Sequence, residues 1–352
     1  MENSTTVISI LPSINSTEEP FKVYKYYYMR VILATLCIVS SVFGVVGNTL
    51  VICAVPLSKK LRTVTNVFIV NLSVSDLMAC TFLPWQAVSV LSEDGWPLPQ
   101  AYWLCVVTSA VFCLSICCSV TNLALIALNR WIGITKSAAT TRRIYTSRNI
   151  ACMIALSWAV PFVLSIMLPL LGIGEIGYEP LYSVCSWVKG NEYSLLHNIL
   201  IIVFFFPAPL AVISLCYISI FRYVLKTSRR LARQDIPSVS DAVSGADRAM
   251  RKKLWKRQIA VTKNLVYIVL AYVICITPFA VSVIPLGYEW SIRLTPYAGA
   301  ILFFNSCVNP IIYATSHPDF KEAFGFMVRC QCTTKPQSRA QSLQLNTRNQ
   351  NK

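Results

Sequence analysis

Seven long apolar segments constrain this chain more than any single residue does. A helix needs about 20 mostly apolar residues to cross the hydrocarbon core of a bilayer. Because a backbone inside a bilayer must satisfy its polar groups internally, such segments predict membrane-spanning helices. The predicted spans are 28–55, 67–91, 102–134, 150–171, 195–225, 259–286 and 294–316. We therefore expect an all-α membrane protein, a bundle of seven transmembrane helices.

The charged residues support this prediction and orient the bundle. Only 13% of the residues are charged, against about 25% in soluble domains. Most of the 31 basic residues lie in the first, third and fifth connections and in the C-terminal tail. Since basic loops stay in the cytoplasm, the sequence predicts an extracellular N-terminus and a cytoplasmic C-terminus. The net charge of +16 then reflects topology and attraction to anionic membrane lipid, and we expect no nucleic-acid partner.

The polar ends of the chain complete the predicted organisation. The expected regions are an extracellular N-terminal segment (1–27), the transmembrane bundle (28–316), a short amphipathic eighth helix (317–328) and a cytoplasmic tail (329–352). Asn3 and Asn15 each begin an Asn-x-Ser/Thr motif, which predicts glycosylation of the N-terminal segment.

The segment after the seventh span has the pattern of a helix on the cytoplasmic membrane face. Phe320, Phe324 and Met327 recur at helical spacing, which predicts one apolar face. Cys330 and Cys332 follow directly and are candidates for palmitoylation, with two free thiols as the alternative.

The cysteines separate by location. Most of the 14 lie inside apolar spans, where a thiol acts as a small hydrophobic group. Cys105 at the start of the third span and Cys185 in the fourth connection lie on the predicted outer side, which is oxidising. Each has no other partner on that side, so we predict a disulfide that fixes the fourth connection over the mouth of the bundle.

A few polar residues lie inside the apolar spans, where they are costly and therefore candidates for function. Asp76 is the only acid in the middle of a span. A carboxylate there would be neutralised by a proton or a cation, and hydroxyl and amide oxygens suit a hard cation. Ser115, Ser119, Asn305 and Asn309 are the expected partners in a sodium or proton site. The alternative is a polar network that only holds helices together.

Several motifs occur together between residues 28 and 328. They are Gly47-Asn48, the run Leu72-Ser73-Val74-Ser75-Asp76, Cys105 with Arg130, Trp158, Pro209, Tyr217, Pro278, and Asn309-Pro310-Ile311-Ile312-Tyr313. Taken together, these motifs resemble those of the rhodopsin-like (class A) G-protein-coupled receptors. The triplet Asn129-Arg130-Trp131, in place of Asp-Arg-Tyr, is also similar to that of the melatonin receptors and of the insect Moody and trapped-in-endoderm receptors.

This resemblance implies a plasma-membrane receptor, not an enzyme, that binds a small extracellular ligand and activates a heterotrimeric G protein. It implies arrestin and receptor kinases as further partners, and no cofactor other than sodium as an allosteric modulator at the Asp76 cluster. The positions implied for activation and coupling are Asn129, Arg130, Trp131, Tyr217, Pro278, Pro310 and Tyr313.

Three departures from the family pattern affect the expected resting state. Ile276 stands where the family has the tryptophan of Cys-Trp-x-Pro, Asn129 carries no charge to hold Arg130, and Gln258 stands where many members have an acid. Because salt bridges of this kind favour the inactive state, we predict basal signalling.

The expected ligand pocket lies in the outer half of the bundle, beneath the loop held by Cys185. Phe112 leaves a monoamine without a counter-ion, and Phe303 replaces the lysine that holds retinal in opsins. The sequence predicts a mostly apolar, aromatic cavity for a neutral or weakly polar molecule, with His197 at the membrane interface. The predicted lining residues are Gln86, Phe112, Cys113, Ile116, Trp187, His197, Asn198, Phe205, Phe279, Tyr297 and Phe303.

Two other classes of function stay open at this point. An ion-coupled transporter would use Asp76 as its ion site, although no internal repeat is evident. A membrane scaffold or adhesion-linked receptor would retain its function without Arg130.

Overall fold

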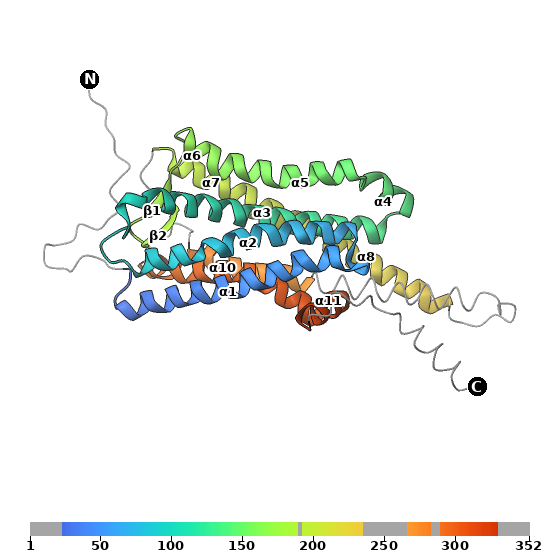
Figure 1. Cartoon of the computed structure of the whole chain (residues 1–352). Coiled ribbons are helices and arrows are strands. Elements are labelled where there is room, and N and C mark those ends of the chain that lie inside the picture. Colours follow the sequence, from blue (N-terminus) through green and yellow to red (C-terminus); the bar gives the residue numbers. More distant parts are fainter. Residues whose placement is uncertain (1–22, 189–191, 235–265, 283–288, 330–352) are drawn as a thin grey trace, which may run out of the picture.

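The computed structural model describes residues 23–188, 192–234, 266–282 and 289–329 of the 352-residue chain. Long helices run side by side and form an elongated bundle (Figure 1). These helices are α1 (Tyr27–Leu57), α2 (Val64–Leu91), α3 (Tyr102–Thr135), α5 (Ser147–Phe162) with its extensions η3 (Val163–Met167) and α6 (Leu168–Leu170), α7 (Ser194–Phe205), α8 (Pro207–Gln234), Val266–Ser282 and α10 (Glu289–Ser316). The shorter elements are η1 (Lys59–Leu61), η2 (Pro99–Ala101), α4 (Ala138–Ile144), β1 (Ile176–Glu179), β2 (Val184–Trp187) and α11 (Pro318–Val328).

The helices have the length and surface of membrane spans. In the described part of the chain, six helical segments are long and apolar enough to cross a bilayer, and Val266–Ser282 is a shorter apolar helix. Each coincides with a predicted span, so the predicted helical bundle is confirmed. Large apolar side chains such as Phe43 and Ile274 face outward from the bundle, with 62% and 68% of their surface exposed. Contact with lipid would avoid the free-energy cost of exposing these apolar side chains to water.

α3 is the central helix of the bundle. Two-thirds (67%) of its most apolar stretch is buried, against 17% for α5 with its extensions. It packs against α2, α5 and α8 and also against the hairpin of β1 and β2. α3 therefore contacts the hairpin at one end of the bundle and extends to the opposite end.

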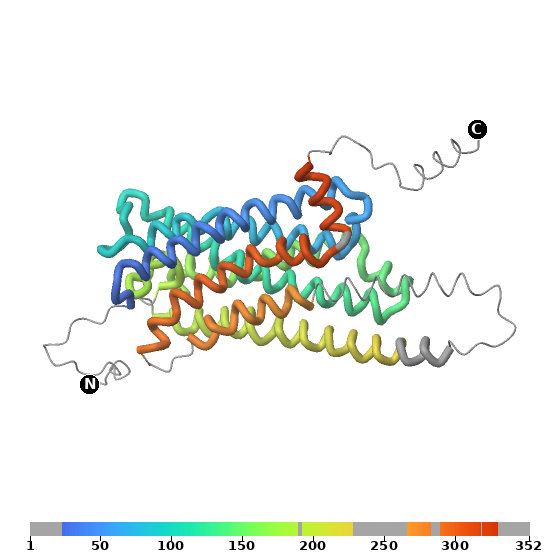
Figure 2. The backbone as a smooth tube through the Cα atoms, turned by 90° about the horizontal axis from the view of Figure 1, so that it is seen from below, coloured from blue at the N-terminus to red at the C-terminus, as the bar shows by residue number. Residues whose placement is uncertain are grey.

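The two ends of the bundle carry different short elements. We name them the hairpin end, with β1 and β2, and the α11 end, with η1, α4 and α11. At the α11 end, α11 turns sharply away from α10 (Figure 2). Phe320 and Phe324 are buried, and the Phe320 ring stacks on Tyr313 with centroids 5.1 Å apart. The predicted helix is present, and its two phenylalanines are buried in the protein, since Phe320 packs on α10 and Phe324 contacts the Phe320 ring.

Prolines alter two of the predicted spans. The predicted span 195–225 is present as α7 followed by α8, with a one-residue turn at Phe206 between them. Pro207 lacks a backbone N–H and is favoured in the first turn of a new helix. Pro161 removes one hydrogen bond inside α5, and the π-helical turn η3 follows directly.

The β1–β2 hairpin and helix α4 were not predicted from the sequence. β1 and β2 form an antiparallel hairpin in which Tyr178 pairs with Cys185. α4 begins after Ser137, whose side-chain oxygen accepts a hydrogen bond from the Thr140 backbone N–H. This cap satisfies one of the free N–H groups at the helix start. Both elements are shorter than the apolar spans and lack their periodic signal.

Gly44 allows α1 to approach α2 and α10 closely. A Cβ atom at this position would overlap Cys80 Sγ and lie 3.2 Å from Cys307 Sγ. Overpacking of a buried site costs about 1–3 kcal/mol. We expect Gly44→Ala to lower the midpoint of thermal unfolding of the purified protein. Gly133→Ala is the matched control, since a Cβ atom there meets nothing within 4 Å; equal midpoints for the two variants would contradict the prediction.

Candidate functional site

A polar cluster lies in the interior between α2, α3 and α10. Asp76 is fully buried, and both of its carboxylate oxygens accept hydrogen bonds. Ser119 Oγ donates to Asp76 Oδ1 over 2.7 Å, and Asn309 Nδ2 donates to Asp76 Oδ2 over 2.8 Å. Ser75, which the sequence prediction did not include, lies 3.1 Å from Ser119 Oγ. The cluster thus joins three helices through one carboxylate.

Several oxygen atoms in this region are buried without a hydrogen-bond partner. They include Ser115 Oγ, Asn305 Oδ1 and Asn309 Oδ1. A buried polar atom left unsatisfied costs about 1–3 kcal/mol. Such atoms fit a hard cation with oxygen ligands, or ordered water. The residues predicted for a sodium site are therefore suitable in type and burial.

The α11 end of α3 carries the Asn129-Arg130-Trp131 triplet. Asn129 is buried, and its Oδ1 atom accepts a hydrogen bond of 2.5 Å from Thr65 Oγ1 on α2. Tyr145, between α4 and α5, lies beside Asn129; burial raises the pKa of its phenol, so the hydroxyl stays protonated. The sequence did not predict these partners, because each pair joins residues from separate elements.

Arg130 is only partly exposed and lacks an acidic partner among the described residues. Its Nε atom has no hydrogen-bond partner, and Tyr217 on α8 is the neighbouring titratable group. The hydroxyls of Tyr217 and Tyr313 are likewise buried without partners. A cation and two hydroxyls thus lie at the α11 end with unused hydrogen-bonding capacity.

The other positions predicted for activation are Pro310, Pro278 and Trp131, and each has a different kind of contact. Pro310 is buried in α10 and would contact a Cβ atom added at Gly47 of α1. Pro278 lies within Val266–Ser282 and is partly buried. Lys136 lies 5.2 Å from the centre of the Trp131 ring, a cation–π contact at the end of α3.

The hairpin end is held by one disulfide and several side chains. The predicted bond between Cys105 and Cys185 is present and joins α3 to β2. Gln86 on α2 makes two hydrogen bonds to the backbone of Cys185. Its side-chain NH₂ group donates to the Cys185 carbonyl, and its side-chain oxygen accepts from the Cys185 N–H. Ser109 Oγ donates to the Gly177 carbonyl over 3.0 Å. Both strands are therefore tied to the transmembrane helices.

The residues predicted to line a ligand pocket separate into groups. Phe112 and Phe303 meet edge to face with ring centroids 3.9 Å apart, and Ile116 packs against the same cluster. Ile116, Trp187 and Phe279 also pack against the main core cluster, to which Phe205 belongs. Cys113 is buried on α3, and Asn198 is partly buried on α7.

Three predicted pocket residues have other contacts. The Gln86 amide is already used by the hairpin, which the sequence did not predict. Tyr297 packs against the cluster of Val23 and Tyr24, just before α1. His197 is buried, with 1% of its surface exposed, and its Nε2 atom lies 2.8 Å from the Leu164 carbonyl. Its position at the membrane interface stays a prediction.

Comparison with known proteins identifies the family. The model of the 7 transmembrane receptor (rhodopsin family) matches residues 47–313. The chain belongs to this family. The receptor is 29% identical to the melatonin receptor type 1A of Gallus gallus over 313 residues, which cover 86% of this chain and 82% of that one.

Two further similarities are more distant or partial. The receptor is 32% identical to the alpha-1D adrenergic receptor of Sus scrofa over 326 residues, covering 82% of this chain but spanning only 55% of that protein's length. Squid rhodopsin has the same fold, with a TM-score of 0.76 and 20% identity over 92% of this chain and 94% of that structure. The predicted class A family is confirmed, together with its likeness to melatonin receptors.

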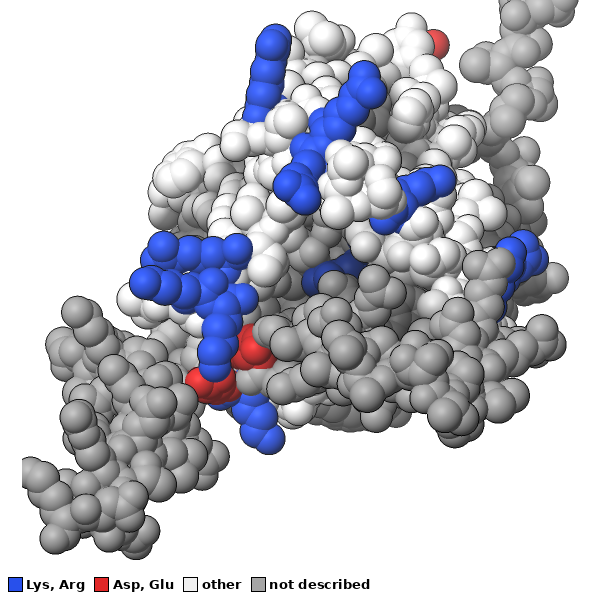
Figure 3. Space-filling view, turned by 90° about the vertical axis from the view of Figure 1, so that its right-hand side faces the viewer, with Lys and Arg blue, Asp and Glu red and all other residues white. Residues whose placement is uncertain are grey.

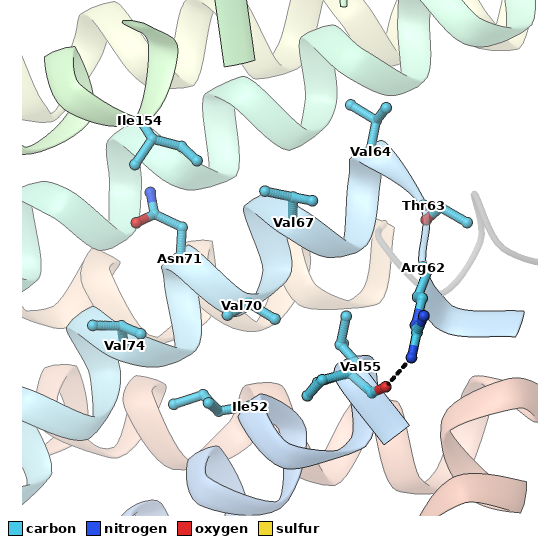
Figure 4. A pocket seen from close by; sticks show the side chains of 11 residues that line it. Ile52, Val55, Arg62, Thr63, Val64, Val67, Val70, Asn71, Val74 and Ile154 are labelled. Atoms are coloured by element: carbon cyan, nitrogen blue, oxygen red, sulfur yellow. Dashed lines mark hydrogen bonds between the residues drawn. The ribbon is translucent and has the colours of Figure 1, made fainter. Parts of the chain in front are cut away.

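A groove on the side of the receptor is separate from these sites. It has a volume of about 780 Å³ and lies between α1, α2 and α5 (Figure 4). Five of its eleven lining residues are valines, and Arg62 at one end donates a hydrogen bond of 2.7 Å to the Pro56 carbonyl. None of the predicted ligand-pocket residues lines it. The remaining predicted sites, Asn3, Asn15, Cys330 and Cys332, lie outside the described residues.

Proposed function

We propose that this receptor detects a small molecule at the hairpin end and activates a heterotrimeric G protein at the α11 end. The observation that carries this proposal is the group formed by Arg130, Tyr217 and Tyr313. Arg130 has an unpartnered Nε atom, and both tyrosine hydroxyls are buried and unpaired. A rearrangement that lets these groups bind each other or a partner protein would recover the cost of their burial.

The charge distribution supports an orientation for the receptor in the plasma membrane. Figure 3 shows the α11 end with several Lys and Arg side chains and few acidic ones among the described residues. By the positive-inside rule, we propose that this end lies in the cytoplasm and the hairpin, with its disulfide, outside. Arrestin and receptor kinases would act on the same cytoplasmic side. The groove beside α1 and α2 would hold an acyl chain of a membrane lipid.

The ligand we propose is a neutral or weakly polar molecule with a hydrogen-bond acceptor. Phe112, Phe303 and Phe279 supply aromatic surface near the predicted cavity. Trp187 Nε1 and Tyr272 Oη, from residues of the main core cluster and its border, are buried without hydrogen-bond partners. An acceptor on the ligand would satisfy such a donor, whereas a cation would meet no carboxylate at Phe112.

Purified full-length receptor in nanodiscs provides the direct test of signalling. We expect it to accelerate guanine-nucleotide exchange on at least one of a panel of Gα proteins without added ligand. Arg130→Ala should remove this acceleration while leaving the thermal-unfolding profile cooperative. A scaffold would show no exchange with any Gα protein, and an ion-coupled transporter would instead accumulate solute in proteoliposomes.

We also propose sodium as an allosteric ligand of the Asp76 cluster. The carboxylate and the unpartnered oxygens of Ser115, Asn305 and Asn309 would hold the ion and so favour the packing seen here. Sodium at ten times its dissociation constant should add about 1.4 kcal/mol of stability. We expect a higher unfolding midpoint in sodium than in N-methylglucamine chloride of equal ionic strength, and no difference for Asp76→Asn. A midpoint that ignores sodium in the unaltered receptor would contradict the proposal.

A further inference from the structure

Two buried thiols on different helices, α2 and α10, lie next to each other and close to the Asp76 cluster. Cys80 on α2 is 0% exposed, and Cys307 on α10 is 1% exposed. They belong to one cluster of buried side chains with Leu83 and Phe112. Both also border the same spot on α1, because a Cβ atom at Gly44 would meet both sulfur atoms.

The surroundings of this pair are not purely apolar. Cys307 Sγ donates to the Ser40 carbonyl over 2.9 Å, so an oxygen ligand lies beside one sulfur. Asp76 is one helical turn from Cys80 on α2. Soft thiolate ligands select zinc, copper(I) and similar ions, with oxygen or water completing the coordination.

Charge balance decides which ion suits this location. When a divalent ion binds, each thiol gives its proton to water, and one cation with two thiolates forms a neutral unit. A monovalent ion bound by both thiolates would leave a net negative charge buried close to the Asp76 carboxylate, which is costly. The arrangement therefore favours a soft divalent cation over copper(I) or silver(I).

We propose that Cys80 and Cys307 form an intramembrane dithiol site for a soft divalent cation of the zinc class. The bound ion would tie α2 to α10 near the middle of the bundle. α10 also carries Asn309 and Tyr313, so the tie would oppose movement of that helix. The effect on signalling rests on the function proposed above, whereas binding of the ion does not.

Cadmium is the probe, because cadmium–thiolate bonds absorb in the ultraviolet. The background is the full-length receptor with serine at the exposed Cys53 and Cys152 and at the tail cysteines Cys330 and Cys332. We expect one cadmium per receptor, a charge-transfer band, and a raised unfolding midpoint. Because two protons leave, lowering the pH by one unit should weaken apparent affinity by up to about 100-fold. Zinc should displace cadmium and remove the band.

Cys80→Ala and Cys307→Ser, tested separately, should each remove the band. Cys37→Ser is the matched control, since Cys37 is a buried thiol that packs against Ala34 and Ala87; it should leave the band intact. A band that survives in both variants, or no band in the background protein, overturns the site. Cooperative unfolding of both variants without cadmium shows that they have folded. If cadmium binds but nucleotide exchange is unchanged, only the link to signalling fails.

Discussion

Breaking the Cys105–Cys185 disulfide should destabilise the receptor more than any other single change described above. The bond closes a loop with a sequence separation of 80 residues, and loss of a native disulfide costs about 2–5 kcal/mol. The loss of stability here should lie at the lower end of this range, because helices that stay inserted in a bilayer restrict the unfolded chain even without the disulfide. We expect the double variant Cys105→Ala with Cys185→Ala to unfold several degrees lower than the unaltered receptor.

The remaining contacts of the hairpin determine how local this damage is. Gln86 bonds the Cys185 backbone twice, and Ser109 holds Gly177, so the hairpin should stay near the bundle. We therefore expect a folded protein with a lower unfolding midpoint, measured by intrinsic fluorescence. Adding Gln86→Leu to the double variant should lower the midpoint further. Cys152→Ser, at an exposed thiol, is the control. An unchanged midpoint in the double variant would show that the side-chain contacts alone fix the hairpin.

The helical bundle was predictable because a bilayer imposes a simple length and polarity on each crossing. Asp76 was predictable for a related reason: an acid in the middle of a span needs partners, and Ser119 and Asn309 supply them. The disulfide followed from the shared location of two cysteines. Each of these inferences depends on the environment of a residue and not on its detailed geometry.

The features that the sequence did not reveal depend on contacts between separate elements. Prolines occur in several spans, but the sequence does not show that Pro207 follows a turn at Phe206 or that a π-helical turn follows Pro161. The use of Gln86 by the hairpin depends on where β2 lies over α2. Likewise, Thr65 reaches Asn129 only because α2 packs beside α3. None of these has a periodic signal in the sequence.

Asn129→Asp should reduce basal nucleotide exchange at least about tenfold. Asn129 now accepts one hydrogen bond from Thr65 and gives Arg130 no opposite charge. An aspartate would keep the Thr65 bond and place a negative charge one residue from the guanidinium. Hydrogen bonds to charged groups contribute about 1.5–3 kcal/mol, and 1.36 kcal/mol corresponds to a factor of ten in an equilibrium.

The direction of this change follows from which state gains the interaction. The aspartate would stabilise the packing described here, in which Arg130 remains at the end of α3. A state in which Arg130 moves to contact a G protein would lose the new pair. The population of that state, and with it ligand-independent exchange, should therefore fall.

Two further variants separate charge from hydrogen bonding at this position. Asn129→Ala removes the Thr65 bond without adding charge, so basal exchange should stay equal or rise. Asn129→Asp combined with Arg130→Lys should recover only part of the reduction, because lysine keeps a charge but loses the planar donor geometry of arginine. All variants are compared by nucleotide exchange at equal receptor concentration in nanodiscs. If Asn129→Asp leaves basal exchange unchanged, the uncharged residue beside Arg130 does not set the resting equilibrium, and the departure from the family's acidic residue has no part in basal activity.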